Sequence, residues 1–373
     1  MIIPLHLDAG PSARTAVRPA LDELGFATSE VRLGDRTALV TEPRGRGEAP
    51  NGAPVPTESI ARLPFVEQVI GSDARAPLVS ATRRPGGHPV RVGSATFGEG
   101  RLTVIAGPCT VEDGEALRET AGAVKAAGAA ALRGGAFKVR TSPHRYQGGG
   151  PEALALMREV ADETGLPFFT ELTDPRQVER YGELLDGVQI GARHMQNFPL
   201  LQEVGKLGKP VLLKRHMSAD LEEWLLAAEY LLAAGNDQVI LCERGIKTGE
   251  RHVRYMLDVG AVPWIKARVG LPVVVDPSHA AGHHALVAPL ARAAVAAGAD
   301  GLIVEVHPRP HQTRCDAMQA LGPDAFAALM DEVRALSAAL GRGALPDATP
   351  AAAAPAGRGD HDDGPGLRRA MGA

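Results

Sequence analysis

Eight short apolar runs alternate with helical stretches between residues 101 and 341, and this alternation constrains the fold more than any other feature. Near-continuous apolar strands suit a parallel sheet that is buried on both faces. Eight β-α repeats in about 240 residues match the size of a (β/α)8 barrel, with an open doubly wound sheet as the alternative. The runs are Leu102–Gly107, Ala129–Arg133, Pro167–Glu171, Gly187–Gly191, Pro210–Lys214, Gln238–Glu243, Pro272–Asp276 and Gly301–Glu305.

The segments between and after these runs carry the apolar spacing of amphipathic helices, and several begin at a proline, which is tolerated in the first helical turn. The predicted helices are Asp113–Ala127, Pro151–Thr164, Pro175–Leu184, Pro199–Leu207, Ala219–Ala233, Pro263–Val269, Leu286–Ala297 and Pro323–Leu340. We therefore expect an α/β protein whose main part, residues 99–341, is a (β/α)8 barrel.

The first 98 residues predict a separate small domain. Apolar runs at Ile2–Leu7 and Thr37–Thr41 flank a helical stretch, Ala13–Leu24, and a second helix is expected over Thr57–Leu63. This pattern reads as a small β-α-β unit. The segments rich in Gly, Pro and Arg, which we expect to be loop and linker, are Pro43–Pro56 and Arg83–Pro89.

The last stretch, residues 342–373, consists mainly of Ala, Pro, Gly and Asp. It contains too few large apolar side chains to offset the entropy of ordering it, so we expect a disordered C-terminal tail.

Overall charge excludes some partners. The chain has 40 Lys and Arg against 44 Asp and Glu, a formal charge of -4, which gives no reason to expect binding to nucleic acid or to an anionic membrane. The segment Met1–Gly10 lacks the features of a signal peptide, and no long apolar stretch is unbroken, so a cytoplasmic location is expected. Three cysteines, an odd number in a long chain, argue against a disulfide framework and leave metal or thiolate chemistry open.

Polar side chains collect where the predicted strands end. In a (β/α)8 barrel these carboxyl ends and the loops after them form the active face, and scattered surface charges would not all fall there. In strand order the residues are Cys109; Arg133, Lys138 and Arg140; Glu171; Arg193; Lys214; Glu243 and Arg244; Asp276 and His279; and Glu305 with Asp316 in the next loop.

Four of these side chains predict a metal site. The seventh, eighth and first strands are neighbours in a closed barrel, so Cys109, His279, Glu305 and Asp316 can converge. One sulfur, one nitrogen and two carboxylates suit a divalent transition ion such as Mn, Fe, Co or Zn better than Mg or Ca. Taken singly, each residue is better explained as a core thiol, a loop histidine or a surface acid, and only their convergence favours the metal.

Six basic residues form a second group, for which an anionic substrate is the functional interpretation. Arginine binds phosphate or carboxylate with a planar fork and lysine acts as a point charge. Thr141 and Ser142 add hydroxyl donors. The alternative is that these cations are solvated or paired with nearby acids. The six are Arg133, Lys138, Arg140, Arg193, Lys214 and Arg244.

The residues lie in phrases that resemble a known family, the type I 3-deoxy-D-arabino-heptulosonate 7-phosphate (DAHP) synthases, in the subgroup with an N-terminal ferredoxin-like domain. The phrases are AGPCTVE from Ala106, LRGGAFKVRTSP from Leu132, FFTELTDP from Phe168, QIGARHMQNFPLL from Gln189, LLKRHMSADLEEWLLAAEYLLAAGN from Leu212, ILCERGIKTGE from Ile240, VVVDPSHAAG from Val273 and EVHPRP from Glu305. The resemblance spans residues 1 to about 341 and is densest over the predicted barrel.

The resemblance implies a reaction: metal-dependent condensation of phosphoenolpyruvate with erythrose 4-phosphate, the first step of the shikimate pathway to the aromatic amino acids. It also implies roles. The implied metal ligands are Cys109, His279, Glu305 and Asp316. The implied substrate-binding residues are Arg133, Lys138 and Lys214 for the phosphoenolpyruvate carboxylate, Arg193, Lys214 and Arg244 for its phosphate, and Arg140, Thr141 and Ser142 for the aldose phosphate. Lys138 is the implied proton donor, and Cys109 and His279 act through the metal.

The sister synthase that uses arabinose 5-phosphate is the main alternative. The segment Lys138–Ser142 resembles the Lys-Pro-Arg-Thr-Ser of the heptulosonate family, and the N-terminal domain favours it too. Departures from the family pattern, of which Val139 and His216 bear most on the aldose, keep another aldehyde, a role in specialised metabolism, or a non-catalytic regulatory homologue open. The departures are Val139 for proline, His216 for glycine, Thr110 for serine, His144-Arg145-Tyr146 for Tyr-Ser-Phe, and Arg309 and His311 for acidic residues.

By resemblance, the N-terminal domain binds an aromatic amino acid as a feedback effector, with a spacer or oligomer contact as the alternative, and the chain forms a homo-oligomer, a tetramer. Smaller signals favour structure over chemistry. Trp224 and Cys242 are expected in the core, and His283-His284 at a solvated helix start. His194 is expected near the site as a backbone-satisfied side chain or a lining one, and Asp276 as a carboxylate that orients neighbours of His279.

Overall fold

The structure is a computed structural model, and it describes residues 2–6, 11–33, 36–43, 57–67, 69, 76–81, 86–140 and 142–343. Residues 344–373 of the expected tail lie outside the described residues. So do residues 44–56 of the first expected loop, residues 83–85 of the second, and Thr141.

Eight parallel strands form a closed barrel, as the sequence predicts, and the open-sheet alternative is excluded. The barrel closes where the last strand pairs with the first, from Gly301 opposite Thr103 to Glu305 opposite Gly107. Every strand lies within the predicted apolar run because a strand buried on both faces needs apolar side chains at consecutive positions. The strands are β6 Thr103–Gly107, β7 Ala131–Arg133, β8 Phe168–Glu171, β9 Gly187–Ile190, β10 Val211–Lys214, β11 Val239–Glu243, β12 Val273–Val275 and β13 Gly301–Glu305.

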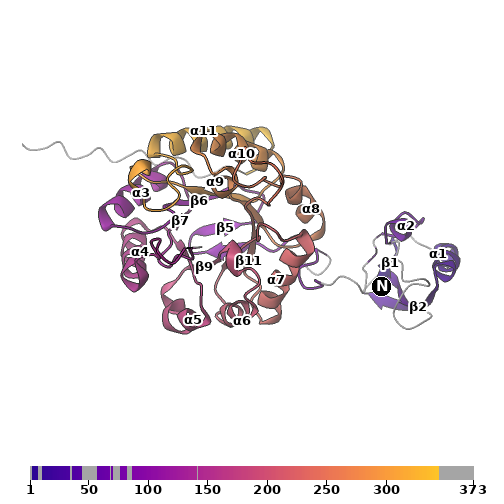
Figure 1. Cartoon of the computed structure of the whole chain (residues 1–373). Helices are drawn as coiled ribbons and strands as arrows, with labels where there is room; N and C mark the ends of the chain where they lie inside the picture. Colours follow the sequence, from indigo (N-terminus) through magenta and orange to yellow (C-terminus); the bar gives the residue numbers. More distant parts are fainter. Residues whose placement is uncertain are drawn as a thin grey trace, which may run out of the picture.

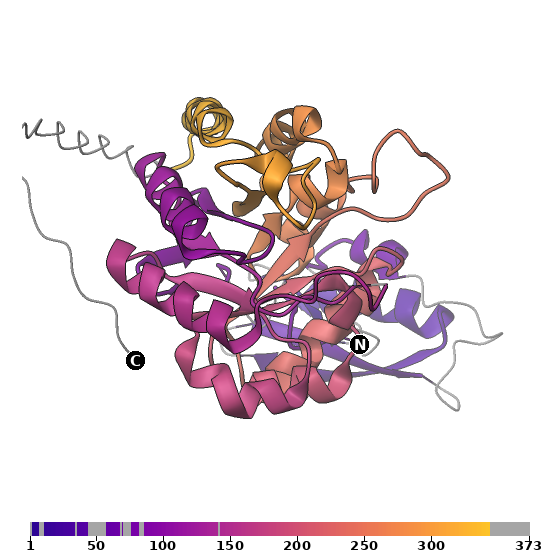
Figure 2. The ribbon, with the colours of Figure 1, turned by 60° about the vertical axis from the view of Figure 1, so that its left-hand side comes forward.

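Helices form a layer outside the strands, which both views of the ribbon show (Figures 1 and 2). Several of them begin at a capping side chain: Asp113, Asp174 and Asp220 each accept a hydrogen bond from a backbone N–H in the first turn. The α-helices are α3 Gly114–Ala126, α4 Gly150–Thr164, α5 Pro175–Tyr181, α6 Phe198–Lys206, α7 Leu221–Ala233, α8 Ala261–Arg268, α9 Pro277–Ala281, α10 His284–Ala296 and α11 Pro323–Ala339. The short 3-10 turns are η1 Gly182–Leu184, η2 Ala192–His194 and η3 Pro310–Gln312.

Two predicted packing residues are confirmed in the core. Trp224 on α7 is fully buried, and its Nε1 donates a hydrogen bond to the carbonyl oxygen of Leu213 at 3.2 Å. Cys242 on β11 is also fully buried, among apolar side chains of the barrel interior. His283 caps α10, and the helix begins at His284 as expected.

A hairpin that the sequence did not predict packs into the barrel interior. Its strands are β4, Val90–Val92, and β5, Ala95–Phe97, and Figure 1 shows β5 across the barrel. The buried hairpin side chains contact Ile105, Ile303 and other inward-facing strand residues. Phe97 meets Phe169 edge to face with ring centroids 6.3 Å apart. The hairpin therefore fills the end of the barrel at which the strands begin.

The N-terminal segment has its own antiparallel sheet in the order β1-β3-β2 and its own core, from Ile3 to Val66. Leu5, just after β1, forms an antiparallel bridge with Val66. Val66 therefore lies at the edge of β1 that β3 leaves open. This is the strand order of a ferredoxin-like fold, with the fourth strand reduced to one bridge. The elements are β1 Ile2–Pro4, α1 Pro11–Glu23, β2 Phe26–Leu33, β3 Arg36–Pro43 and α2 Thr57–Ala61.

Strand β2 was missed because polar residues such as Thr28, Ser29 and Glu30 interrupt its apolar pattern. The domain boundaries at residues 98 and 341 stay predictions. Among the described residues, no helix has the length and apolar character needed to cross a membrane.

Candidate active site

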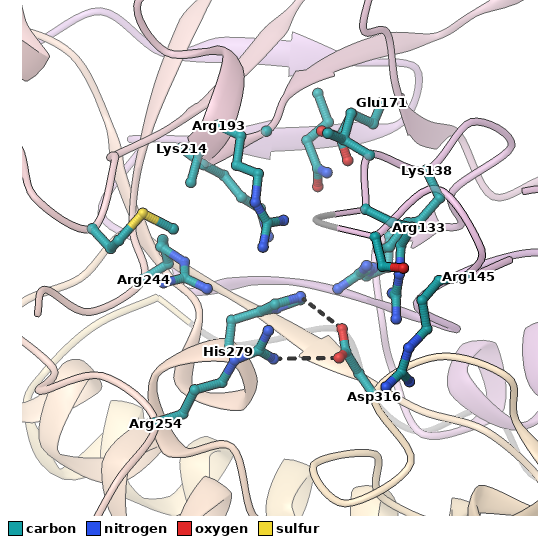
Figure 3. A pocket seen from close by; sticks show the side chains of 17 residues that line it. Arg133, Lys138, Arg145, Glu171, Arg193, Lys214, Arg244, Arg254, His279 and Asp316 are labelled. Atoms are coloured by element: carbon teal, nitrogen blue, oxygen red, sulfur yellow. Dashed lines mark hydrogen bonds and ion pairs between the residues drawn. The ribbon is translucent and has the colours of Figure 1, made fainter. Parts of the chain in front are cut away.

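A cleft of about 400 Å³ opens at the carboxyl ends of the barrel strands, where the sequence places the active face. Its walls come from strand ends and from the loops that follow them (Figure 3). The lining residues are Arg133, Lys138, Val139, Arg140, Ser142, Arg145, Glu171, Gln189, Gly191, Ala192, Arg193, Lys214, Met217, Arg244, Arg254, His279 and Asp316.

The cleft is strongly cationic. Eight of its lining side chains are Lys or Arg, and only two are carboxylates, Glu171 and Asp316. Arg133, Lys214 and Arg244 are buried, with 3%, 4% and 4% of their surface exposed. Such an excess of positive charge in a concave site raises the local concentration of anions.

Two of these cations, Arg133 and Arg244, have buried N–H groups without a hydrogen-bond partner among the described residues. Nε and Nη1 of Arg133 and Nη1 of Arg244 are buried and have no hydrogen-bond partner among the described residues. Burial lowers the pKa of Arg244, whose guanidinium also lies over the ring of Tyr255 at 4.2 Å. Because a buried donor without a partner is costly, these groups fit an anion that would accept their hydrogen bonds.

Beside the cleft, the structure brings together the four side chains that the sequence predicts as metal ligands. Cys109 follows β6, Glu305 ends β13, His279 lies on α9, and Asp316 lies in the loop after β13. Each offers one ligand atom, and the four atoms lie within 4.8 Å of one another. The convergence that the barrel topology predicts is thus present.

Glu305 provides a test of whether a cation fits there. Its side chain is fully buried, and Oε1 has no hydrogen-bond partner among the described residues, while Oε2 accepts from Gln319. Burial raises the pKa of Glu305 well above its usual range, and the neighbouring Cys109 adds to the shift. A buried carboxylate oxygen without a donor fits direct contact with a cation, so the cluster can hold a divalent metal ion.

His279 is oriented for the same centre. Its Nδ1 lies 2.8 Å from Oδ2 of Asp276, and its Nε2 lies 3.9 Å from a carboxylate oxygen of Glu305 and of Asp316. Burial lowers the pKa of His279 to about 3, so the imidazole is neutral, as a metal ligand must be. Asp276 therefore contacts His279 itself, whereas the sequence suggested that it would orient the neighbours of His279.

Two of the remaining predicted site residues, Lys138 and Arg140, contact cysteine sulfurs at the metal cluster. Lys138 lies against the metal cluster, with Nζ 2.7 Å from Sγ of Cys109. Burial alone would lower the pKa of Lys138, but the sulfurs of Cys109 and Cys315 raise it. Nη1 of Arg140 lies 2.7 Å from Sγ of Cys315. Lys138 and Arg140 also line the cleft, as Ser142 and Arg193 do. Thr141 lies outside the described residues.

Some expectations need correction or addition. Glu243 does not reach the cleft, because its fully buried carboxylate accepts a hydrogen bond from Arg215 at 2.9 Å. His194 lies 3.8 Å from Glu171 and is not among the lining residues. Arg145 and Arg254 line the cleft but were missed, since each lies within a long loop where only its basic character could have pointed to the site.

A closed (β/α)8 barrel with a cationic cleft and a metal-ligand cluster at the carboxyl ends of its strands defines a TIM-barrel enzyme. The sequence profile of the DAHP synthetase I family matches residues 87–339. The chain belongs to this family, which confirms the resemblance seen in the sequence.

The chain is similar to proteins with two different aldolase activities. The phospho-2-dehydro-3-deoxyheptonate aldolase of Thermotoga maritima is 45% identical over 287 residues, which cover 77% of this chain and 85% of that protein. A 2-dehydro-3-deoxyphosphooctonate aldolase of Nitratidesulfovibrio vulgaris is 33% identical over 254 residues, 63% of this chain and 92% of that one.

A crystal structure of the Thermotoga maritima DAHP synthase superposes with a TM-score of 0.72 at 39% identity and covers 91% of this chain and 98% of that chain. The chain is therefore an enzyme with the aldolase activity of the DAHP synthases, as predicted.

Proposed function

We propose that the chain condenses phosphoenolpyruvate with erythrose 4-phosphate, with the help of one divalent transition metal ion, to give DAHP and inorganic phosphate. The observation that carries this proposal is the cleft itself, in which eight cations face two carboxylates next to the four converging ligand atoms. Phosphoenolpyruvate brings a phosphate and a carboxylate, and the aldose brings a second phosphate, so both substrates match the sign and the number of these charges.

Phosphoenolpyruvate fits the floor of the cleft. Arg133, Lys138 and Lys214 are proposed to bind its carboxylate, and Arg193, Lys214 and Arg244 its phosphate. The unpaired donors of Arg133 and Arg244 support this placement, because each would gain an anionic acceptor. Arg140, Thr141 and Ser142 are proposed to bind the aldose phosphate nearer the rim.

Cys109, His279, Glu305 and Asp316 would hold the metal ion, which would polarise the aldehyde carbonyl of the aldose when bound. Carbon 3 of phosphoenolpyruvate then attacks the aldehyde carbon. We assign to Lys138 the delivery of a proton to the former aldehyde oxygen, and its contact with the proposed ligand Cys109 supports this role. Water adds at carbon 2, and phosphate leaves by C–O cleavage while Arg193, Lys214 and Arg244 compensate its charge.

Arabinose 5-phosphate is the second candidate for the aldehyde, because a phosphooctonate aldolase is 33% identical to this chain. The greater identity to the heptonate aldolase and the segment Lys138–Ser142 favour erythrose 4-phosphate. A non-catalytic homologue is disfavoured, since all four ligands and all six predicted cations are present.

The test is the metal-dependent consumption of phosphoenolpyruvate by purified protein, with each aldose in parallel and with EDTA as a control. Turnover with erythrose 4-phosphate that stops when metal is removed is the expected result. Turnover with arabinose 5-phosphate alone would overturn the aldehyde assignment. Arg193→Ala is expected to raise KM for phosphoenolpyruvate by at least about tenfold, since a charge-assisted hydrogen bond is lost. Arg176→Ala, at an exposed position on α5, is the matched control.

We also propose a cytoplasmic homo-oligomer, with a tetramer as the expected state, and an aromatic amino acid as effector of the N-terminal segment. The ferredoxin-like strand order of that segment supports the last point. Size-exclusion chromatography with light scattering and calorimetric titration with phenylalanine and tyrosine test the two proposals.

A further inference from the structure

Asp316 differs from the other three predicted metal ligands in the support of its backbone. Cys109 follows a barrel strand, Glu305 ends one and His279 lies on α9, whereas Asp316 lies in the irregular segment between η3 and α11. Its φ is 58°, in the left-handed region that residues other than glycine rarely adopt. A backbone in this conformation persists only where the surrounding contacts fix it, so other parts of the chain must restrain the segment.

The carboxylate of Glu112 supplies such contacts. Its Oε1 accepts a hydrogen bond from Oγ1 of Thr313 at 2.7 Å and from the backbone N–H of Arg314 at 2.8 Å, and its Oε2 accepts from the same N–H at 3.1 Å. The backbone N–H of Cys315 in turn donates to Oγ1 of Thr313 at 3.3 Å. Glu112 thus restrains the three residues that directly precede Asp316.

Glu112 also belongs to the loop that carries another ligand. It lies three residues after Cys109 and ends the phrase AGPCTVE, of which only the cysteine has a part in the proposed reaction. This loop is itself held in place, because the N–H of Val111 donates to the carbonyl oxygen of Gly135 at 3.0 Å. One carboxylate therefore connects the loop of Cys109 to the segment of Asp316.

The other contacts of Asp316 are of a different kind. Its side chain contacts Arg254 at 3.4 Å and Cys109 at 3.3 Å, but through the carboxylate oxygens that would bind the metal. Beyond Asp316, the carbonyl oxygen of Met318 accepts from the backbone N–H of His284 at 2.7 Å. The segment is therefore fixed on the C-terminal side of Asp316 by a backbone contact, and on its N-terminal side by the carboxylate after β6.

We propose that Glu112 is a positioning residue of the metal centre, which restrains residues 313–315 so that the carboxylate of Asp316 lies where the other three ligand atoms converge. The inference rests on the proposed function, because it requires a metal ion bound by Asp316. Without Glu112 the segment gains conformational freedom, and metal binding must order it again at a cost in affinity. Outer contacts that orient metal ligands typically change metal affinity about 10- to 100-fold.

The ion pair of Arg309 and Glu119 provides a matched control. Nη1 of Arg309 lies 2.6 Å from Oε2 of Glu119, so this pair also connects the region after β6 to the region after β13. It is exposed, and it lies seven residues before Asp316 on the other side of η3. Because exposed ion pairs contribute little, its loss should leave the position of Asp316 unchanged.

The experiment measures Mn²⁺ affinity by competition with a coloured chelator, without substrate. Glu112→Ala is expected to lower the affinity about tenfold, and Glu112→Gln, which keeps one acceptor oxygen, by a smaller factor. Glu119→Ala is expected to change it by less than about twofold. Urea unfolding of the metal-free proteins checks that each variant is folded. Wild-type affinity in Glu112→Ala, or equal losses in Glu112→Ala and Glu119→Ala, would overturn the proposal.

A double-mutant cycle with Asp316→Ala separates positioning from a general loss of structure. If Glu112 acts through Asp316, Glu112→Ala leaves the reduced affinity of Asp316→Ala unchanged. A further tenfold loss in that background would refute the inference, since Glu112 would then support the site without Asp316. Wild-type affinity in Asp316→Ala would instead show that the proposed ligand set is wrong, and the inference would fall with it. A loss in Asp316→Ala but none in Glu112→Ala refutes the inference alone.

Discussion

Replacing Asp276 with asparagine tests whether one buried carboxylate organises both the metal cluster and the anion site. Asp276 is fully buried, and its Oδ2 lies 2.5 Å from Nζ of Lys214 and 2.8 Å from Nδ1 of His279. Its Oδ1 accepts the backbone N–H of His279 at 2.9 Å. Asparagine keeps the shape and the backbone acceptor but turns an amide N–H2 group toward two other donors.

The substitution is expected to lower both the stability of the protein and its affinity for metal, by amounts that can be estimated. Removing one partner of a buried charge pair leaves Lys214 uncompensated and costs about 3–5 kcal/mol of unfolding free energy. Loss of the partner that orients a metal-binding histidine typically lowers metal affinity about 10- to 100-fold, or roughly 1.4–2.8 kcal/mol. Competition with a coloured chelator measures the Mn²⁺ affinity at neutral pH, and urea unfolding of the metal-free protein measures the stability.

Asp300 offers a matched control. It is also a buried aspartate, with Oδ1 2.6 Å from Nζ of Lys266 and Oδ2 accepting the backbone N–H of Val273 at 2.9 Å, but it precedes β13 at the opposite end of the barrel. Asp300→Asn is expected to lower stability and leave Mn²⁺ affinity unchanged. Wild-type affinity in Asp276→Asn, or the same affinity loss in both variants, would refute the reasoning.

Four stability predictions can be checked by urea unfolding. Gly107→Ala is expected to cost about 3 kcal/mol or more, because a Cβ there would lie 2.1 Å from the carbonyl oxygen of Arg133 at a φ of 150°. Gly122→Ala, in open space on α3, should instead stabilise by about 0.5–1 kcal/mol, and a loss there would contradict the clash argument. Trp224→Phe removes the indole hydrogen bond and should cost about 1–3 kcal/mol, which an unchanged midpoint would disprove. Burial raises the pKa of Cys242 from 9.0 to about 12, so above pH 9 the folded chain holds one more proton than the unfolded chain. Wild type should then lose about 1.4 kcal/mol per pH unit relative to Cys242→Ala, and a constant difference across this range would refute the shift.

The barrel was predictable because its strands carry their own signal. A parallel strand covered on both sides must be apolar at consecutive positions, and the loops between these strands are marked by Gly, Pro and charged residues. The hairpin of β4 and β5 was not predictable, since strands of three residues leave too short a pattern. Strand β2 was missed for another reason, because its polar residues hide the alternation of apolar and polar side chains that marks a strand.

The convergence of Cys109, His279 and Glu305 could be predicted from topology, because the barrel places the ends of β12, β13 and β6 side by side. Asp316 lies in the loop after β13, which no strand register positions. Loop residues have no such register, which explains why Arg145 and Arg254 were missed. The prediction that Glu243 faces the cleft was wrong. Its position at a strand end matches the site, but its side chain pairs with Arg215. The contact between Cys109 and Cys315 depends on a loop conformation that no periodicity encodes.

The hairpin of β4 and β5 closes the end of the barrel at which the strands begin. Among the described residues, Phe97 and its neighbours fill that end, so we expect substrates and products to pass through the cleft at the other end. Arg133 and Lys214 lie buried on the floor, and Arg145 lies exposed at the rim. With phosphoenolpyruvate placed at the floor and the aldose at the rim, as proposed, we expect phosphoenolpyruvate to bind first and the bound aldose to block its departure.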